Sequence, residues 1–231
     1  RPGAFSRLTA GLKFLKKVGH PVTANMCVTS YAMDSLIHLP ELLREYGIRQ
    51  LCIDMVRPVS VGQRTDKWMR DMVPRFSDLA PKIGEMLEEF EKSDPGFDIN
   101  ITHLPFCQLP EWGHRISHGG SPTITFTADL KREQGVVDKY AFQAEDRGLI
   151  PECEDCVFLN QCTGIPHEYS RLYGNDEINS LSWEELAKRD PSRNNLVIFL
   201  EPALARFIAK PVPPGWTLQS VQGDHRARQI D

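Results

Sequence analysis

The chain has 231 residues, of which 41% are hydrophobic and 25% are charged, an ordinary composition for a globular protein of one large or two small domains. The formal net charge of −4 provides no basic patch of the kind that binds nucleic acid. No apolar run approaches the ~20 residues that cross a bilayer, and six cysteines are too few for a disulfide scaffold in a chain of this length. We therefore expect a cytoplasmic protein that binds neither nucleic acid nor a membrane.

The first half of the chain alternates between helical and extended patterns. In order, we expect a helix with Phe5, Leu8, Leu12 and Leu15 on one face, a buried strand over 21–29, a helix from Asp34 to a capping Gly47, a strand over 48–56, a helical region over 66–92 interrupted at Pro74, and a strand over 97–101. Such alternation with short connections predicts an α/β fold with a parallel sheet. Because closing a barrel takes about eight strands, we expect the missing ones to lie upstream of Arg1.

The second half has a different character. It contains a short β-rich piece over 123–127, a short helix over 167–174 and an apolar helix over 196–208, and its last twenty or so residues are rich in proline and polar residues. We expect that tail to be extended or disordered. The predicted organisation is an α/β part over 1–104, a cysteine-rich extension over 105–180, and a C-terminal helix with a flexible tail over 181–231.

The extension contains three thiols within a stretch of ten residues. Cys153, Cys156 and Cys162 follow a C-x2-C-x5-C spacing, and Cys107 lies upstream of them. Four thiolates can hold either a tetrahedral zinc ion or an iron–sulfur cluster, and spacing alone does not choose between them. Gly164 would let the backbone approach the sulfurs closely. Cys27 and Cys52 stand singly in predicted strands, so we interpret them as core thiols.

Polar residues at the predicted strand ends form a second candidate site. In a parallel barrel the carboxyl ends of the strands carry the chemistry, so Asn25, Thr29, Asp54 and Arg57 are candidates to line a binding site. A network of hydrogen bonds at the strand ends explains these four residues equally well.

The histidines give weaker signals. His103 lies either near the cysteines or at a strand end, and the strand end is the favoured interpretation. His114 and His118 have the i, i+4 spacing of a metal pair on a helix, but the glycines beside them favour a solvated loop.

The chain resembles radical S-adenosylmethionine (radical SAM) enzymes that carry a C-terminal extension of the SPASM or twitch type. The resemblance covers roughly Pro2 to Glu177. Residues 22–31 and 48–58 look like the fourth and fifth strands of the partial barrel, and the four cysteines with Thr163-Gly164-Ile165-Pro166 look like the extension. The resemblance implies the C-terminal part of a partial (β/α)6 TIM-like barrel, in which Cys107, Cys153, Cys156 and Cys162 ligate an auxiliary 4Fe–4S cluster.

The resemblance also implies S-adenosylmethionine, a second 4Fe–4S cluster in the full-length parent enzyme, a small-molecule or peptide substrate, and an electron-donor protein as partner. The C-x3-C-x2-C motif that holds the family's radical-generating cluster does not occur in this sequence. We therefore expect this chain alone to hold the auxiliary cluster without generating the radical. The alternative is an interaction module without catalysis, stabilised by zinc on the four cysteines.

Overall fold

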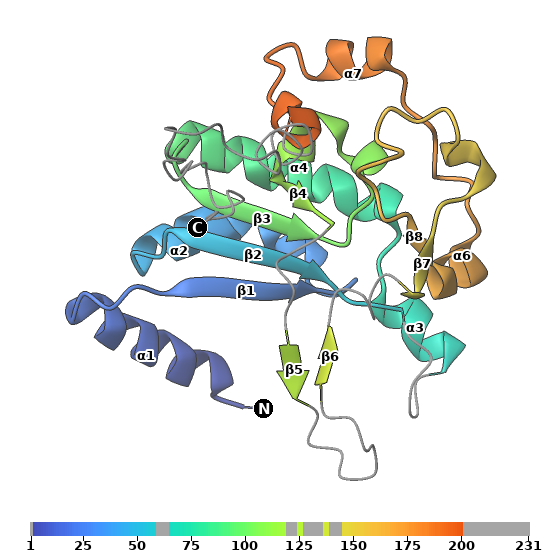
Figure 1. Cartoon of the computed structure of the whole chain (residues 1–231). Helices are drawn as coiled ribbons and strands as arrows, with labels where there is room; N and C mark the ends of the chain where they lie inside the picture. The colour runs from blue at the N-terminus through green and yellow to red at the C-terminus, as the bar shows by residue number, and fades with distance from the viewer. Residues whose placement is uncertain (1, 59–64, 119–123, 127–135, 139–144, 201–231) are drawn as a thin grey trace, which may run out of the picture.

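The structure is a computed structural model that describes residues 2–58, 65–118, 124–126, 136–138 and 145–200. It is a mixed α/β protein organised around a four-stranded parallel sheet in the order β1-β2-β3-β4 (Figure 1). The strands are β1 (Thr23–Val28), β2 (Gln50–Met55), β3 (Asp98–Thr102) and β4 (Ile116–Ser117). The sheet thus continues beyond residue 104, because β4 pairs with the end of β3.

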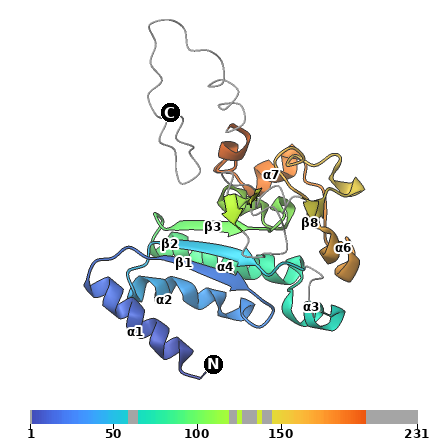
Figure 2. The same cartoon turned by 60° about the horizontal axis from the view of Figure 1, so that its bottom comes forward.

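Helices connect the strands and gather on one face of the sheet (Figure 2). They are α1 (Ala4–Lys17), the 3-10 helix η1 (Met33–His38), α2 (Leu39–Glu45) and α4 (Phe76–Ser93). The α3 helix (Asp66–Met72) lies past the carboxyl ends of the strands, beside α6 (His167–Tyr173; Figure 1). The α4 helix packs on both η1 and α2. Among the helices that the structure describes, none combines the length and apolar character needed to cross a bilayer.

Alternation of side chains along the strands explains where the core lies. Leu51, Ile53 and Met55 of β2 and Ile99 and Ile101 of β3 are buried. Their intervening neighbours are polar and only half-buried. Because successive strand residues point to opposite faces, the sheet has one apolar face and one polar face. The α4 helix supplies the other side of the core through a buried apolar stripe, namely Phe76, Leu79, Ala80, Ile83, Met86, Leu87 and Phe90.

The remaining elements form the extension at the carboxyl ends of the strands (Figure 1). They are η2 (Phe106–Gln108), η3 (Pro110–Arg115), β5 (Ile124–Phe126), β6 (Val136–Asp138), β7 (Arg147–Gly148), η4 (Pro151–Cys153), β8 (Ile165–Pro166), α6 (His167–Tyr173) and α7 (Trp183–Arg189). Two antiparallel pairs occur here, β5 with β6 and β7 with β8.

Most expected elements are present. The helical region over 66–92 breaks at Pro74 into α3 and α4, and Gly47 ends α2 with a φ of 69° and a bond from its N–H to the Arg44 carbonyl. The helix expected from Asp34 is instead a 3-10 helix followed by α2, which has Pro40 in its first turn. Residues 196–200 are helical; the rest of the predicted last helix and the tail lie outside the described residues.

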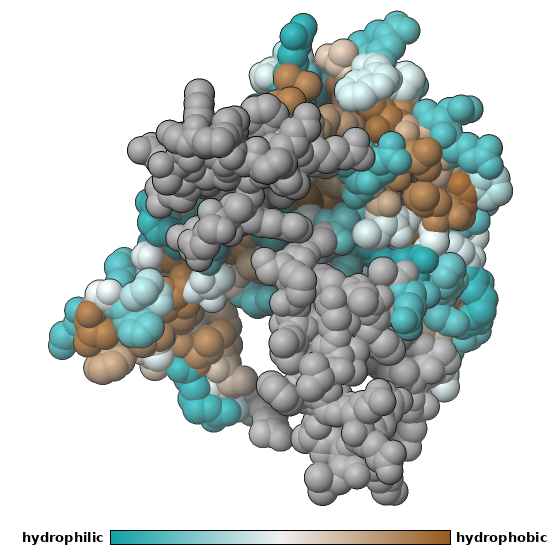
Figure 3. Space-filling model, viewed as in Figure 1, coloured by the Kyte–Doolittle hydropathy of each residue, from teal (hydrophilic) through white to brown (hydrophobic). Residues whose placement is uncertain are grey.

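The prediction of a buried first strand is wrong. In β1 only Val28 is buried, whereas Thr23, Asn25 and Cys27 are exposed. Cys27 is therefore not a core thiol, and Cys52 is only partly buried. The strand lies at the edge of the sheet, and no buried residue belongs to α1, the helix before it. Phe5, Leu8 and Phe14 of α1 are each more than half exposed, and the apolar surface of this helix is visible at the left of Figure 3.

Candidate metal centre

Two separate turns bring the four predicted thiols to one place. Cys107 lies in η2 directly after β3, and Cys153, Cys156 and Cys162 lie on the turns between β7 and β8. The backbone N–H of Phe106 donates a hydrogen bond to the Cys162 sulfur, which joins the two turns directly. All four cysteines pack against the hydrophobic core, and all are free thiols.

Aromatic side chains pack where the Cys107 turn meets the turns of the other three cysteines. Phe106 and Phe158 are 3% and 1% exposed, and their rings stack with centroids 4.7 Å apart. Phe106 also stacks on His118 at 4.4 Å. The four cysteines, each partly buried, therefore lie beside apolar side chains, which influence the potential of any metal centre held there.

The thiols are close enough to affect one another electrostatically. Burial raises the pKa of Cys107 to about 12, and the neighbouring Cys162, Cys156 and Cys153 contribute to that rise, while a hydrogen bond from Gln108 opposes it. Burial likewise raises the pKa of Cys162, against hydrogen bonds from the Gly164 and Phe106 backbones. For Cys162 the nearby Arg147 guanidinium also opposes the rise in pKa, because a positive charge favours the thiolate.

The described side chains do not form a ready-made single-ion site. Within the part of the chain that the structure describes, no group of three or more histidine, cysteine or carboxylate side chains is placed to hold one metal ion. A zinc ion binds thiolates at about 2.3 Å, so its four sulfurs must nearly touch. A cubane spreads its four thiolates over four separate irons and is the larger occupant.

Donors to sulfur are already in place. The Gly164 N–H donates to the Cys162 sulfur at 3.4 Å, as expected of a backbone that approaches the thiols closely. The Gln108 side-chain amide lies 3.9 Å from the Cys107 sulfur. Hydrogen bonds to thiolate sulfur are among the groups that tune iron–sulfur centres, so these donors suit a thiolate-bound metal.

Two glycines allow the turns to close around the thiols. Gly164 has a φ of +79°, and a Cβ placed on it would lie 2.0 Å from the carbonyl oxygen of Gly148. Gly148 is also confined, because a Cβ there would meet the His167 ring at 2.8 Å. The close β7–β8 pairing therefore depends on glycine at position 164, where the clash is with backbone atoms, whereas the His167 ring could shift to admit a Cβ at position 148.

A part-buried arginine lies beside the thiols, and no pattern in the sequence identifies it. Arg147 of β7 donates to the Thr163 hydroxyl at 2.8 Å and to the His103 carbonyl oxygen at 2.9 Å. Burial lowers the pKa of Arg147 to about 10, against the attraction of Cys162 and with the repulsion of Arg57. Among the described residues it forms no ion pair with a carboxylate, since Asp146 pairs with Arg57 instead.

The four predicted strand-end residues fall into two groups. Asp54 accepts a hydrogen bond from Asn25 across the polar face at 3.4 Å and another from Thr102. Thr29 lies just beyond β1, where its carbonyl accepts from the N–H groups of the following turn. Arg57 follows the end of β2 and forms an ion pair with Asp146 of the extension. It lines a cavity of about 10 Å³, the room of roughly one water, together with Arg147 and His103.

The hydrogen bonds of Asp54 belong to a polar face of the sheet that has three rows of side chains. Strand register aligns Thr23, Gln50 and Asp98 in the first row, Asn25, Cys52 and Asn100 in the second, and Cys27, Asp54 and Thr102 in the third. Thr23 donates to Gln50 at 2.5 Å, and Gln50 donates to Asp98 at 2.7 Å. Parallel sheets usually carry apolar side chains on both faces. A hydrogen-bonded polar face at this position is therefore suited to a polar ligand rather than to a packed layer.

The histidine predictions are corrected in part. His103 follows the end of β3, in line with the favoured interpretation, and has a φ of +69°. His118 is not in a solvated loop: its ring is half-buried, contacts the Leu104 carbonyl at 2.6 Å and accepts the Thr163 N–H at 3.0 Å. Since His114 lies in η3 beside Trp112, the two histidines do not share the face of one α-helix. His118 instead ties the end of the sheet to the residue after Cys162.

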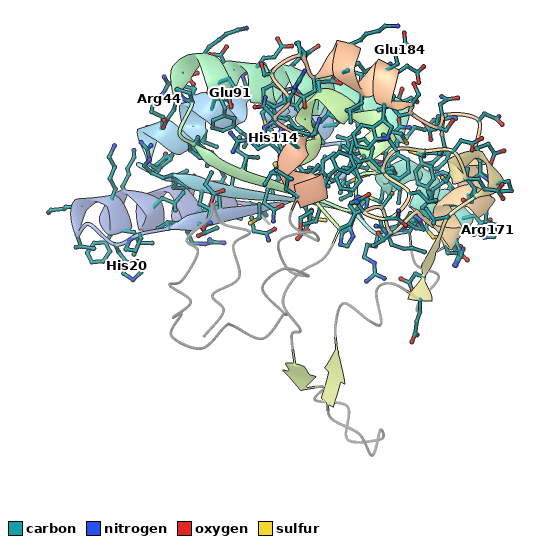
Figure 4. All side chains as sticks on the ribbon, turned by 45° about the horizontal axis from the view of Figure 1, so that its top comes forward. His20, Arg44, Glu91, His114, Arg171 and Glu184 are labelled. Carbon is teal, nitrogen blue, oxygen red and sulfur yellow. The ribbon has the colours of Figure 1, made fainter. Side chains whose placement is uncertain are left out.

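Polar contacts attach the far side of the extension to the helices. Arg171 of α6, at the right of Figure 4, forms a two-pronged ion pair with Asp66 of α3, with N–O distances of 2.8 and 2.6 Å. Glu177 accepts hydrogen bonds from the Tyr169 hydroxyl and the Ser77 N–H. Tyr169 in turn accepts the Phe76 N–H at 2.7 Å. These contacts satisfy N–H groups at the start of α4, which have no partners within the helix.

We expect Glu177→Gln to destabilise the fold by about 1–3 kcal/mol at neutral pH. Burial opposes the charge of Glu177, but hydrogen bonds from Tyr169 and Ser77 and the nearby Arg75 together lower its pKa below the usual 4.5. A carboxylate with a lowered pKa stabilises the fold fully above its unfolded pKa and loses that contribution as the pH falls through the folded value. Urea unfolding of parent and variant should therefore differ most near pH 7 and converge below pH 4.5. The exposed neighbour Asp176, changed to Asn, is the control, and an equal difference at both pH values would contradict the assignment.

Comparison of the chain with protein-family models, with curated proteins and with solved structures found no match. The geometry of the thiols, the part-buried arginine and the polar sheet face are therefore the basis for assigning a function.

Proposed function

We propose that this chain is the C-terminal portion of a radical SAM iron–sulfur enzyme, in which Cys107, Cys153, Cys156 and Cys162 ligate an auxiliary 4Fe–4S cluster. The observation that carries the proposal is the meeting of four thiols from two separate turns in one group packed against the hydrophobic core. When bound, such a cluster would supply either a coordination site for substrate or a relay for electrons. The chain's own contribution is to shield the sulfurs in part from water and to donate hydrogen bonds to them.

Four thiols can hold either a 4Fe–4S cluster or a lone zinc ion. Among the described residues, no group of three or more ligand side chains is already placed to hold a metal ion. The resemblance to radical SAM enzymes favours the cluster, and the N–H donors to the Cys162 and Cys107 sulfurs suit a thiolate-bound centre.

The sheet supports the barrel part of the proposal. In a barrel, consecutive strands are neighbours, helices lie outside and the inner face lines the interior. The β1-β2-β3-β4 order, the helices on one face and the hydrogen-bonded polar side chains on the other all fit a partial (β/α)6 barrel. We propose that Asn25, Thr29, Asp54 and Arg57 lie on its ligand-binding side, toward S-adenosylmethionine or substrate.

The edge of the sheet also fits a larger barrel. Within the described ranges, β1 pairs with a strand on one side only, and the α1 helix beside it exposes Phe5 and Leu8. One further strand-and-helix unit, added before α1, would pair with the strand and cover the helix. The second cluster and the bound S-adenosylmethionine of the parent enzyme would belong to such added units.

Anaerobic reconstitution tests the proposal. The chain is incubated with ferrous iron and sulfide, desalted, and assayed for iron, sulfide, zinc and visible absorption. We expect a brown protein with about four irons per chain, as four thiolates around a cubane require. A colourless protein with one zinc per chain would assign the cysteines to the zinc-stabilised module instead. A sample treated without sulfide controls for iron that binds nonspecifically.

A further inference from the structure

The side chain of Arg147 has a charge that the described groups around it do not balance. Both of its hydrogen-bond acceptors are neutral, the Thr163 hydroxyl and the His103 carbonyl. Its neighbour Arg57 is a second cation, which forms an ion pair with the nearby carboxylate of Asp146. A charge held partly out of water without a counter-ion is unfavourable, so the position calls for an anion that these groups do not supply.

The thiol group is the natural source of that anion. Arg147 donates a hydrogen bond to Thr163, the residue after Cys162, and a Cys162 thiolate would attract its guanidinium. Once metal is bound the four cysteines are thiolates, and a 4Fe–4S centre with four thiolates carries net negative charge. The centre would then supply the negative charge that the arginine lacks, and the arginine would offset part of the charge of the centre.

We propose that Arg147 is a positioning residue that sets the reduction potential of the auxiliary cluster. The inference rests on the proposed iron–sulfur centre. One-electron reduction adds a negative charge to the cluster, and a fixed cation close to it stabilises the reduced form more than the oxidised form. Partial burial keeps the interaction strong, because little water lies between the two charges to screen it. Arg147 therefore raises the potential above the value that the four thiolates alone would give.

Neutralising Arg147 measures this contribution. The Arg147→Gln variant keeps an amide that can donate to Thr163 and His103 while it removes the charge. In a redox titration of the reconstituted protein followed by EPR, we expect the ratio of reduced to oxidised cluster at a fixed potential to fall at least tenfold, which is about 59 mV for one electron. Arg147→Lys retains the charge and should remain within threefold of the parent ratio.

The control removes an exposed guanidinium at the amino end of β2. Arg49 precedes that strand and pairs with Asp94, so Arg49→Gln changes the net charge equally and should leave the potential unchanged. A fully loaded Arg147→Gln protein with the parent potential would overturn the proposal. If Arg147→Gln fails to hold iron, Arg147→Lys decides: a loaded Lys variant supports the need for charge, and an unloaded one shows a purely structural role.

The outcome for the parent chain separates this inference from the proposed function. If the unmodified chain takes up zinc or no metal, the iron–sulfur assignment fails before any variant is compared. If the parent holds its cluster and Arg147→Gln does not shift the potential, only the role of Arg147 fails.

Discussion

The Cys107→Ala variant should hold less than half of the iron of the parent chain after anaerobic reconstitution. Cys107 is the one predicted ligand that lies in η2, directly after β3. Burial raises its pKa to about 12. Without it one iron of a cubane has no thiolate, and the apolar side chains around the site supply no other ligand. We expect the visible absorption to fall in proportion to the iron.

Two comparisons make this result specific. Cys27 is an exposed thiol on β1 and is not one of the four predicted ligands. The Cys27→Ala variant should therefore bind as much iron as the parent. Thermal unfolding of the metal-free proteins shows whether Cys107→Ala has simply damaged the fold. A folded Cys107→Ala protein with the full iron content would remove Cys107 from the site and leave three ligands on one loop.

Local pattern is sufficient to predict much of the fold. The apolar repeat of α4, the proline between α3 and α4, and the glycine after α2 are all signals that act within a few residues. The same is true of the cysteines, since C-x2-C places two thiols on one turn whatever the rest of the chain does. These features could be predicted because no distant segment is needed to produce them.

The errors concern features that depend on neighbours in space. The β-branched composition of β1 suggests burial, but its exposure follows from its place at the edge of the sheet, which composition does not specify. The α7 helix, in contrast, has a local signal that could have predicted it, a capping box in which Ser182 and Glu185 bond each other's backbone N–H groups.

The most informative residues of the site give no signal in the sequence. Arg147 looks like an ordinary surface arginine until the β7–β8 pairing partly buries it, and His118 looks like a loop residue until Phe106 stacks on it. Gly148 matters because Gly164 meets it from sixteen residues away. Such roles arise from tertiary contacts between segments, so spacing along the chain cannot identify them.

Gly164→Ala should be among the most damaging single substitutions in the extension, destabilising it by more than about 3 kcal/mol. The new methyl group would lie 2.0 Å from the Gly148 carbonyl oxygen and 2.7 Å from the Leu149 nitrogen. Both are backbone atoms, so no side-chain rotation can relieve the clash. The positive φ adds the strain that any Cβ feels in the left-handed region.

The Gly174→Ala variant separates the steric clash from the strain of a positive φ. Gly174 ends α6 with a φ of +74°, and nothing lies within 4 Å of the position that its Cβ would take, so alanine there brings only the conformational cost of about 1–2 kcal/mol. Urea unfolding measures both variants, and iron uptake shows the consequence for the site. Opening the β7–β8 pair moves Arg147 and the Gly164 N–H away from Cys162, so Gly164→Ala should lose iron while Gly174→Ala retains it. Equal losses in the two variants would mean that close packing of β7 on β8 is not what holds the thiols together.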